Sequence, residues 1–182
     1  CIRDRLYVMD EQVVRKNLRR FHESMQKYYG GRGEVHYASK AFSCLEMCRI
    51  VASEGDGLDA VSIGELYTAV KAGFPMDKVG FHGNNKTNDE LEYALDCGVG
   101  HIIVDNISEL HRLEKIAAEK GVKANIMFRI KPGIDAHTHD FVKTGQIDSK
   151  FGFALETGEA FEAVKEAIAC ENVSLEGLHC HI

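Results

Sequence analysis

Val35-His36-Tyr37-Ala38-Ser39-Lys40-Ala41 is a short, mostly apolar stretch with a single lysine, and it follows the glycine cluster Gly30-Gly31-Arg32-Gly33. β-Branched and aromatic residues beside a glycine turn predict a strand. Because side chains alternate along a strand, His36, Ala38 and Lys40 are expected on one face. A lysine that faces an apolar interior loses hydration, which lowers its pKa and makes the amine a nucleophile for Schiff-base chemistry. The alternative is a lysine that ends a strand and reaches into water.

The composition is that of an ordinary globular protein: 182 residues, of which 45% are hydrophobic and 27% charged, with a net charge of -6. An acidic chain offers no basic patch to nucleic acid or to an anionic membrane surface. No apolar run approaches the roughly 18 residues of a membrane span. The six cysteines lack the spacing of a metal site or a disulfide framework. These features predict a cytoplasmic protein that binds neither nucleic acid nor membranes.

Strand and helix patterns alternate along the chain. Apolar runs without strict polar alternation predict strands buried on both faces, and each is followed after a short connection by a helical pattern. The expected strands are 35–41, 57–62, 78–83, 101–105, 124–130 and 175–182, after a brief extended run at 6–9. The expected helices are one that Asp10 caps and that ends before Gly30, then 44–53, 64–72, 88–97, 108–120 and 157–169. This order is typical of a TIM-type (β/α)8 barrel, with about six of its eight strands present.

The polar stretch 131–152 breaks this rhythm, because it is far longer than the usual connection between elements. Long loops in such folds tend to carry function. We expect residues 1–33 to form an N-terminal strand and helix that lead into the barrel. Residues 34–182 are expected to form a partial barrel that stops after its sixth strand.

Three polar residues lie at or just after the C-terminal ends of the second and third expected strands. Strand C-terminal ends converge on one mouth of a barrel, so Asp59 is expected near Lys40, with Glu65 close by. Alternatively, the two carboxylates only complement the dipole of the next helix. His82 ends a strand that runs into a polar turn, where an anion or a ring substituent can be bound, although a capped turn explains it equally well. We include His82 among the candidate cofactor-binding residues.

Two histidine pairs support a competing hypothesis, a metal-dependent barrel hydrolase. His137-Thr138-His139 and His179-Cys180-His181 have a spacing that occurs in metal sites. No carboxylate close in sequence completes a ligand shell around the second pair, and an imidazole can instead stack on an aromatic cofactor ring. Arg129 and Lys150 are cations in otherwise uncharged stretches, and a buried cation needs a partner. Arg129 could meet a phenolate-like oxygen or form an internal ion pair.

Five stretches together resemble the fold type III, pyridoxal-phosphate-dependent amino-acid decarboxylases. Tyr37-Ala38-Ser39-Lys40-Ala41 matches the strand that carries the cofactor lysine, and the segment from Asp59 to Glu65 matches an Asp-x-x-Ser-x-Gly-Glu motif. His181 matches the stacking histidine of a His-x-His-Ile-Gly-Ser strand. Pro132-Gly133-Ile134-Asp135-Ala136-His137-Thr138-His139 and Asp148-Ser149-Lys150-Phe151-Gly152 are similar to the diaminopimelate branch in particular. The resemblance covers nearly the whole chain.

The resemblance implies a cofactor, pyridoxal 5'-phosphate, and a role for each matched residue. Lys40 would be linked to the cofactor, His181 would stack on its pyridine ring, and Arg129 would lie near its phenol oxygen. Asp59 and Glu65 would be placed beside the lysine. The implied reaction is decarboxylation of meso-2,6-diaminopimelate to L-lysine.

The resemblance also implies a homodimer, in which Lys150 would face the partner subunit. The chain stops before the glycine of the His-Ile-Gly-Ser motif and before the last barrel strands of that family. We therefore expect a fragment that is inactive alone. A non-catalytic barrel protein that binds pyridoxal phosphate is the alternative.

Overall fold

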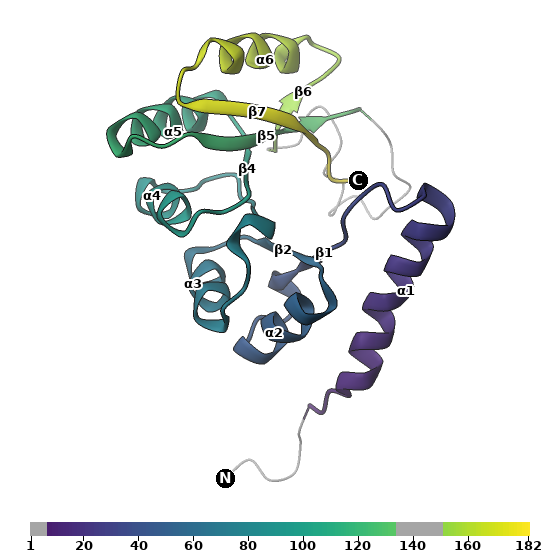
Figure 1. Cartoon of the computed structure of the whole chain (residues 1–182). Coiled ribbons are helices and arrows are strands. Elements are labelled where there is room, and N and C mark those ends of the chain that lie inside the picture. The colour runs from purple at the N-terminus through teal and green to yellow at the C-terminus, as the bar shows by residue number, and fades with distance from the viewer. Residues whose placement is uncertain (1–6, 134–150) are drawn as a thin grey trace.

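Helices and strands alternate along the described part of the chain, residues 7–133 and 151–182 of the computed structural model (Figure 1). The strands are β1 (His36–Ala38), β2 (Gly57–Ala60), β3 (Val79–Phe81), β4 (His101–Val104), β5 (Ala124–Lys131), β6 (Phe153–Ala154) and β7 (Val173–His179). The helices are α1 (Glu11–Tyr29), α2 (Leu45–Glu54), α3 (Ile63–Ala72), α4 (Asn88–Cys97), α5 (Ile107–Lys120) and α6 (Glu159–Ala169), with 3-10 turns η1 (Ser39–Ala41) and η2 (Met76–Lys78). None of the described helices is both long and apolar enough to span a membrane.

All described strands belong to one parallel sheet. The order is β1-β2-β3-β4-β5, with β7 beside β5 along most of its length and β6 beside the C-terminal end of β5. Helices α2 to α6 lie on the outer side of the curved sheet, which stays open between β1 and β7 (Figure 1). Since the strands are parallel, their C-terminal ends share one edge. The predicted incomplete (β/α) barrel is confirmed.

Local caps explain why the connections between helices and strands are short. The side chains of Ser62, Thr87 and Asn106 each accept a hydrogen bond from the backbone N–H three residues later, which starts helices α3, α4 and α5. These helices end at glycines in the left-handed conformation, such as Gly73 with φ of 74° and Gly121 with φ of 64°. Each chain segment therefore turns back at once toward the sheet.

The two faces of the sheet carry different residues. Apolar side chains that alternate along the strands are fully buried against the helices, namely Leu58, Ala60, Phe81, Ile102, Val104, Ile126 and Phe128. On β5 the intervening Met127 and Arg129 are only half-buried. The inner face therefore remains partly accessible and polar, whereas the sheet–helix layer is a finished hydrophobic core.

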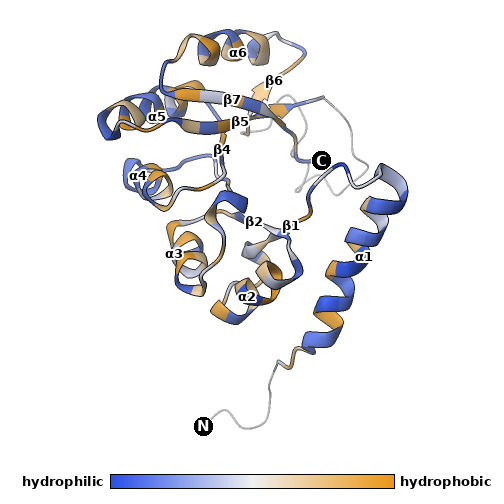
Figure 2. Ribbon diagram, in the orientation of Figure 1, coloured by the Kyte–Doolittle hydropathy of each residue, from blue (hydrophilic) through white to orange (hydrophobic). Residues whose placement is uncertain are grey.

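Helix α1 is attached to this layer mainly through polar contacts. Most of the helix is hydrophilic (Figure 2), and Leu18 is its buried residue. Arg15 and Arg19 donate hydrogen bonds of 2.7 to 2.8 Å to the carboxylate of Glu54 at the end of α2. His22 contacts the buried carboxylate of Asp56. The helix thus lies beside α2 rather than in the barrel wall.

Several strand predictions are wrong in detail. β1 ends at Ala38, and Lys40 lies in the 3-10 turn η1, because the Ser39 hydroxyl contacts the Asp59 carbonyl and the Glu65 carboxylate and turns the chain. β7 ends at His179, so His181 lies beyond the strand. Residues 7–9 form no strand. The short strand β6 was not predicted, and it brings the sheet to seven strands in the described residues.

Candidate active site

Polar side chains gather on the inner face of the sheet near the C-terminal ends of the strands. Strand register explains the grouping: Ala38 pairs with Asp59, and Asp59 in turn pairs with Gly80 on the next strand. On the other side of the sheet Arg129 pairs with His179. Register partners in a parallel sheet project from the same face, so these residues share the inner surface.

Asp59 lies between two imidazoles. Its Oδ1 is 2.9 Å from Nδ1 of His36 and 3.4 Å from Nε2 of His82. Gly80 leaves room for this contact, because a Cβ there would stand 3.1 Å from the same carboxylate oxygen. Partial burial alone would raise the pKa of Asp59, but the hydrogen bonds and charges of His36 and His82 outweigh it and hold that pKa well below its usual range. The hydrogen bond to Asp59 correspondingly raises the pKa of His36.

His179 extends this cluster toward β5. Its ring meets that of His82 edge to face, with centroids 4.9 Å apart. Burial, and then the nearby charges of His82 and Arg129, lower the pKa of His179 to about 4. Its buried Nε2 has no hydrogen-bond partner within the described residues. His179 is therefore a neutral imidazole at neutral pH, with a nitrogen that is left for a ligand or a water molecule.

His181 follows the last strand and is exposed. Partial burial lowers its pKa, and the charges of Arg129, Lys40 and His82 lower it further. The charges of Lys40 in η1, of His82 after β3 and of Arg129 on β5 thus all act at the end of β7. Of the four residues that were predicted to bind a cofactor, His82 and Arg129 lie beside His179, through a ring contact and through strand register.

Lys40 itself is exposed, which corrects the expected apolar surroundings. Its position is fixed by its neighbour: the Ser39 hydroxyl is 2.8 Å from the Asp59 carbonyl oxygen and also contacts the Glu65 carboxylate. Glu65 also accepts a hydrogen bond of 2.9 Å from the Val61 N–H. Glu65 is therefore occupied with holding the turn in place, and the amine of Lys40 projects from a rigid support.

Arg129 lies between a carboxylate and an aromatic ring. Its Nε is 3.9 Å from Oδ1 of Asp105, and its guanidinium is 4.3 Å from the centre of the Phe151 ring. Burial lowers the pKa of Arg129, an effect that Asp105 opposes. The predicted Lys150 lies outside the described residues, as do His137 and His139.

A buried ion pair was missed by the sequence analysis. Nζ of Lys86 is 2.7 Å from Oε1 of Glu109, and both side chains are almost fully buried. The ammonium also donates to the carbonyl oxygens of Gly83 and Ile103, so its three donors are used. A lysine in a polar turn and a glutamate in the first turn of a helix give no sign of burial. The only available signal was the spacing of Asp105 and Glu109, one helical turn apart after a strand.

The described residues form no metal site. No group of three or more His, Cys, Asp and Glu side chains in 7–133 and 151–182 is arranged to hold a metal ion.

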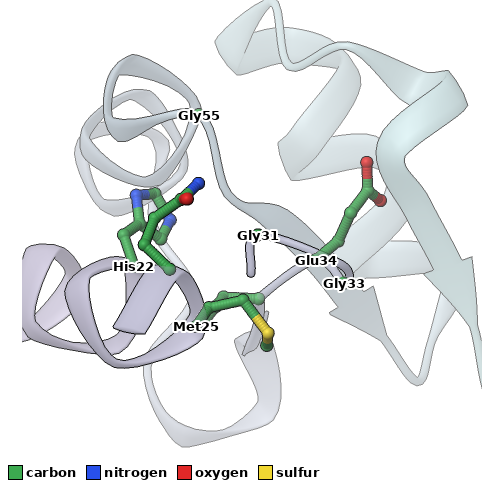
Figure 3. Close-up of a pocket in the computed structure, with 8 residues that line it drawn as sticks. His22, Met25, Gly31, Gly33, Glu34 and Gly55 are labelled. Carbon is green, nitrogen blue, oxygen red and sulfur yellow. The ribbon is translucent and has the colours of Figure 1, made fainter. Parts of the chain in front are cut away.

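A cavity lies apart from this cluster. It has a volume of about 220 Å³, lies between α1 and the segment that precedes β1, and is lined by His22, Met25, Gly31, Gly33, Glu34 and Gly55 among others (Figure 3). Gly55 precedes β2, so the cavity is at the N-terminal ends of the strands, opposite Lys40.

The candidate site contains a lysine amine, neutral imidazoles and a guanidinium at the C-terminal edge of a parallel sheet. The chain is therefore an incomplete (β/α) barrel domain whose candidate site includes a lysine. The chain belongs to the pyridoxal-dependent decarboxylases, since the model of their pyridoxal-binding domain matches residues 13–182. The residues present fit pyridoxal phosphate, the cofactor of this family: the Lys40 amine is accessible to an aldehyde, and flat imidazoles and Arg129 are available to the ring and its oxygens.

Similar proteins point to one branch of the family. The chain is 50% identical over 177 residues to the diaminopimelate decarboxylase of Bacillus methanolicus, which covers 97% of this chain and 41% of that protein. It is 46% identical to the diaminopimelate decarboxylase of Bacillus subtilis, with 97% and 40% covered. The crystal structure of diaminopimelate decarboxylase from M. jannaschii in complex with L-lysine has a TM-score of 0.88 and 38% identity, with 98% of this chain and 42% of that chain covered. The chain thus spans about two fifths of the length of these relatives.

Proposed function

We propose that this chain forms the lysine-bearing part of a diaminopimelate decarboxylase, which converts meso-2,6-diaminopimelate to L-lysine with pyridoxal phosphate. The single observation that carries the proposal is the polar cluster on the inner face. Asp59 lies between His36 and His82, the His82 ring meets that of His179, and Arg129 is the register partner of His179. The identity to diaminopimelate decarboxylases over 97% of the chain supports the choice of substrate.

The residues of this chain take distinct roles in the proposal. When bound, pyridoxal phosphate supplies an electron sink for the electrons that remain when the carboxylate leaves. Lys40 would hold the cofactor covalently through its amine. His181 would hold the ring as a neutral imidazole, and Arg129 would hold the phenol oxygen with its positive charge.

Carboxylates support the lysine side of the site. Asp59, ionised between His36 and His82, would provide a negative charge to the cofactor site and holds His82 at the inner face. Glu65 keeps the Lys40 turn in register through Ser39. Because these groups are fixed before any ligand binds, little reorganisation is needed when the cofactor enters.

The whole enzyme requires more than these 182 residues. The chain spans about 40% of the length of its relatives, and the sheet formed by the described residues is open between β1 and β7. We infer that the chain alone is inactive and that activity arises in a cytoplasmic homodimer to which Lys150 contributes at the partner subunit.

A chimera tests this proposal. The chain would replace the matching 177 residues of the Bacillus methanolicus relative, and release of labelled carbon dioxide from diaminopimelate would be measured. We expect activity within about tenfold of the unaltered relative and a loss of at least about a thousandfold on Lys40→Ala, because the cofactor link is then gone. A folded chimera that binds pyridoxal phosphate without releasing carbon dioxide would instead support the non-catalytic carrier.

A further inference from the structure

The carboxylate of Asp105, directly after β4, is buried and only half used. The residue is 4% exposed, and its Oδ2 accepts a hydrogen bond of 3.1 Å from the Gly152 N–H. Among residues 7–133 and 151–182, its Oδ1 has no hydrogen-bond partner, and it lies 3.9 Å from Nε of Arg129. A buried carboxylate oxygen without a hydrogen bond is costly unless a nearby charge compensates it. The charge of Arg129 acts on this carboxylate, as do those of Lys86 and Lys131, and Arg129 is the one within 3.9 Å among the described residues.

The position of Asp105 is fixed from the helix side. Its backbone N–H points to Oε2 of Glu109 at 3.4 Å, and Glu109 is in turn held by Lys86 at 2.7 Å. Lys86 is anchored to two backbone carbonyl oxygens. Asp105 therefore rests on a buried network that leaves its carboxylate little freedom.

Phe151 and Gly152 both lie close to Arg129 and contact it. Gly152 has a φ of 70°, and a Cβ at this position would stand 2.6 Å from the carbonyl oxygen of Arg129. Only glycine allows this approach. Phe151 meanwhile stacks on the guanidinium. The carboxylate of Asp105 contacts both the Gly152 backbone and Arg129, so it links the segment at Gly152 to strand β5.

We infer that Asp105 is a positioning residue that fixes the guanidinium of Arg129 at the inner face of the barrel and ties Gly152 beside β5. Asp105 lies behind Arg129 and acts on bound ligands only through it. That the ligand of Arg129 is the phenol oxygen of pyridoxal phosphate rests on the proposed function. The restraint of Arg129 by Asp105 is independent of any ligand.

The restraint can be measured directly by NMR. Exchange of the Arg129 Nε–H with water would be compared in the parent chain, in Asp105→Asn and in Asp96→Asn, a matched change at an exposed ion pair of 2.7 Å to Lys120. We expect exchange to accelerate about tenfold or more in Asp105→Asn, because the carboxylate charge 3.9 Å from Nε no longer restrains the guanidinium. Asp96→Asn should leave it unchanged. An unaltered Arg129 signal in folded Asp105→Asn would overturn the inference.

A second variant covers the case in which Asp105→Asn fails to fold. Asp105→Glu keeps the negative charge but shifts the carboxylate, and the Arg129 Nε–H should again exchange faster than in the parent chain. Parent-like exchange in Asp105→Glu would contradict positioning by this side chain.

Titration with pyridoxal phosphate separates this inference from the proposed function. Asp105→Asn should weaken binding about tenfold in the parent chain but less than about twofold in the Arg129→Gln background, since Asp105 acts through Arg129. Equal losses in both backgrounds would overturn the inference. If the parent chain bound no cofactor, the titration would be repeated in the chimera with the Bacillus methanolicus relative, where absence of binding would refute the proposed function, and the NMR exchange rates would still decide the role of Asp105.

Discussion

Strand β5 has one face that contributes to the hydrophobic core and one face that contributes to the candidate site. Ile126 and Phe128 point to the helices and are fully buried, whereas Met127 and Arg129 alternate with them and face the open interior. The outer face is filled by apolar side chains from every helix between α2 and α6. The inner face carries imidazoles, carboxylates and a guanidinium. The sheet–helix layer can therefore form while the barrel remains open, and the inner face is left to bind a ligand.

The charged groups of the two faces also differ in how deeply they are buried. Lys86 and Glu109 are buried on the helix side and satisfy each other and nearby backbone groups. Asp59 and His36 on the inner face are each about one third exposed at their side chains. We expect the first pair to be essential to folding and the second to affect the site more than stability.

The largest predicted effect separates adjacent residues of β5. Phe128→Ala should lower the free energy of unfolding by about 4 kcal/mol, because it leaves a cavity in the finished layer. Met127→Ala, the matched change on the inner face, should cost less than about 1.5 kcal/mol, because the side chain is only half-buried. Urea unfolding of both variants measures the difference. Equal losses would refute the division between the faces.

Glu109→Gln should be the next most damaging change. It leaves the Lys86 ammonium buried without its counter-charge, which costs about 3 kcal/mol. Asp96→Asn breaks an ion pair of the same 2.7 Å length at the surface and should cost less than about 1 kcal/mol. Thermal unfolding of the two variants at one pH provides the test, and a Glu109→Gln protein as stable as Asp96→Asn would contradict our view of the buried pair.

The smallest predicted effect depends on pH. The low pKa of Asp59 adds stability above the unfolded value of about 3.9, and this is lost as the pH falls through the folded value. The raised pKa of His36 adds stability below about 6.5 that is lost as the pH rises through its folded value. Asp59→Asn should therefore cost most, about 1 kcal/mol, between about pH 4 and 6.5.

Unfolding of Asp59→Asn and of a control, Asp77→Asn at an exposed position, would be followed across the pH range. The difference between Asp59→Asn and the parent chain should narrow at both ends of that range. A difference that stayed constant with pH would mean that the pair with His36 does not form.

Much of the barrel follows from local sequence patterns. Apolar runs and caps such as Ser62 determine where strands and helices alternate, and the common edge of parallel strands predicts that Asp59 lies near Lys40. The remaining details depend on contacts between distant segments. Lys40 leaves its strand because Ser39 meets Glu65, 26 residues away. Lys86 and Glu109 are buried only because a turn and a helix pack together, which neither local sequence indicates.

The most direct test of the inner face is to trap the cofactor where it binds. The chain would be mixed with pyridoxal phosphate and reduced with borohydride, which fixes even a weakly held cofactor to its lysine, and the modified peptide would be mapped by mass spectrometry. Lys40→Ala is the control. We predict label at Lys40, where an accessible amine lies near His181 and Arg129, and its loss in the control. Label at Lys86 or Lys150, or label scattered over the surface lysines and unchanged in Lys40→Ala, would contradict the assignment of this face to the cofactor.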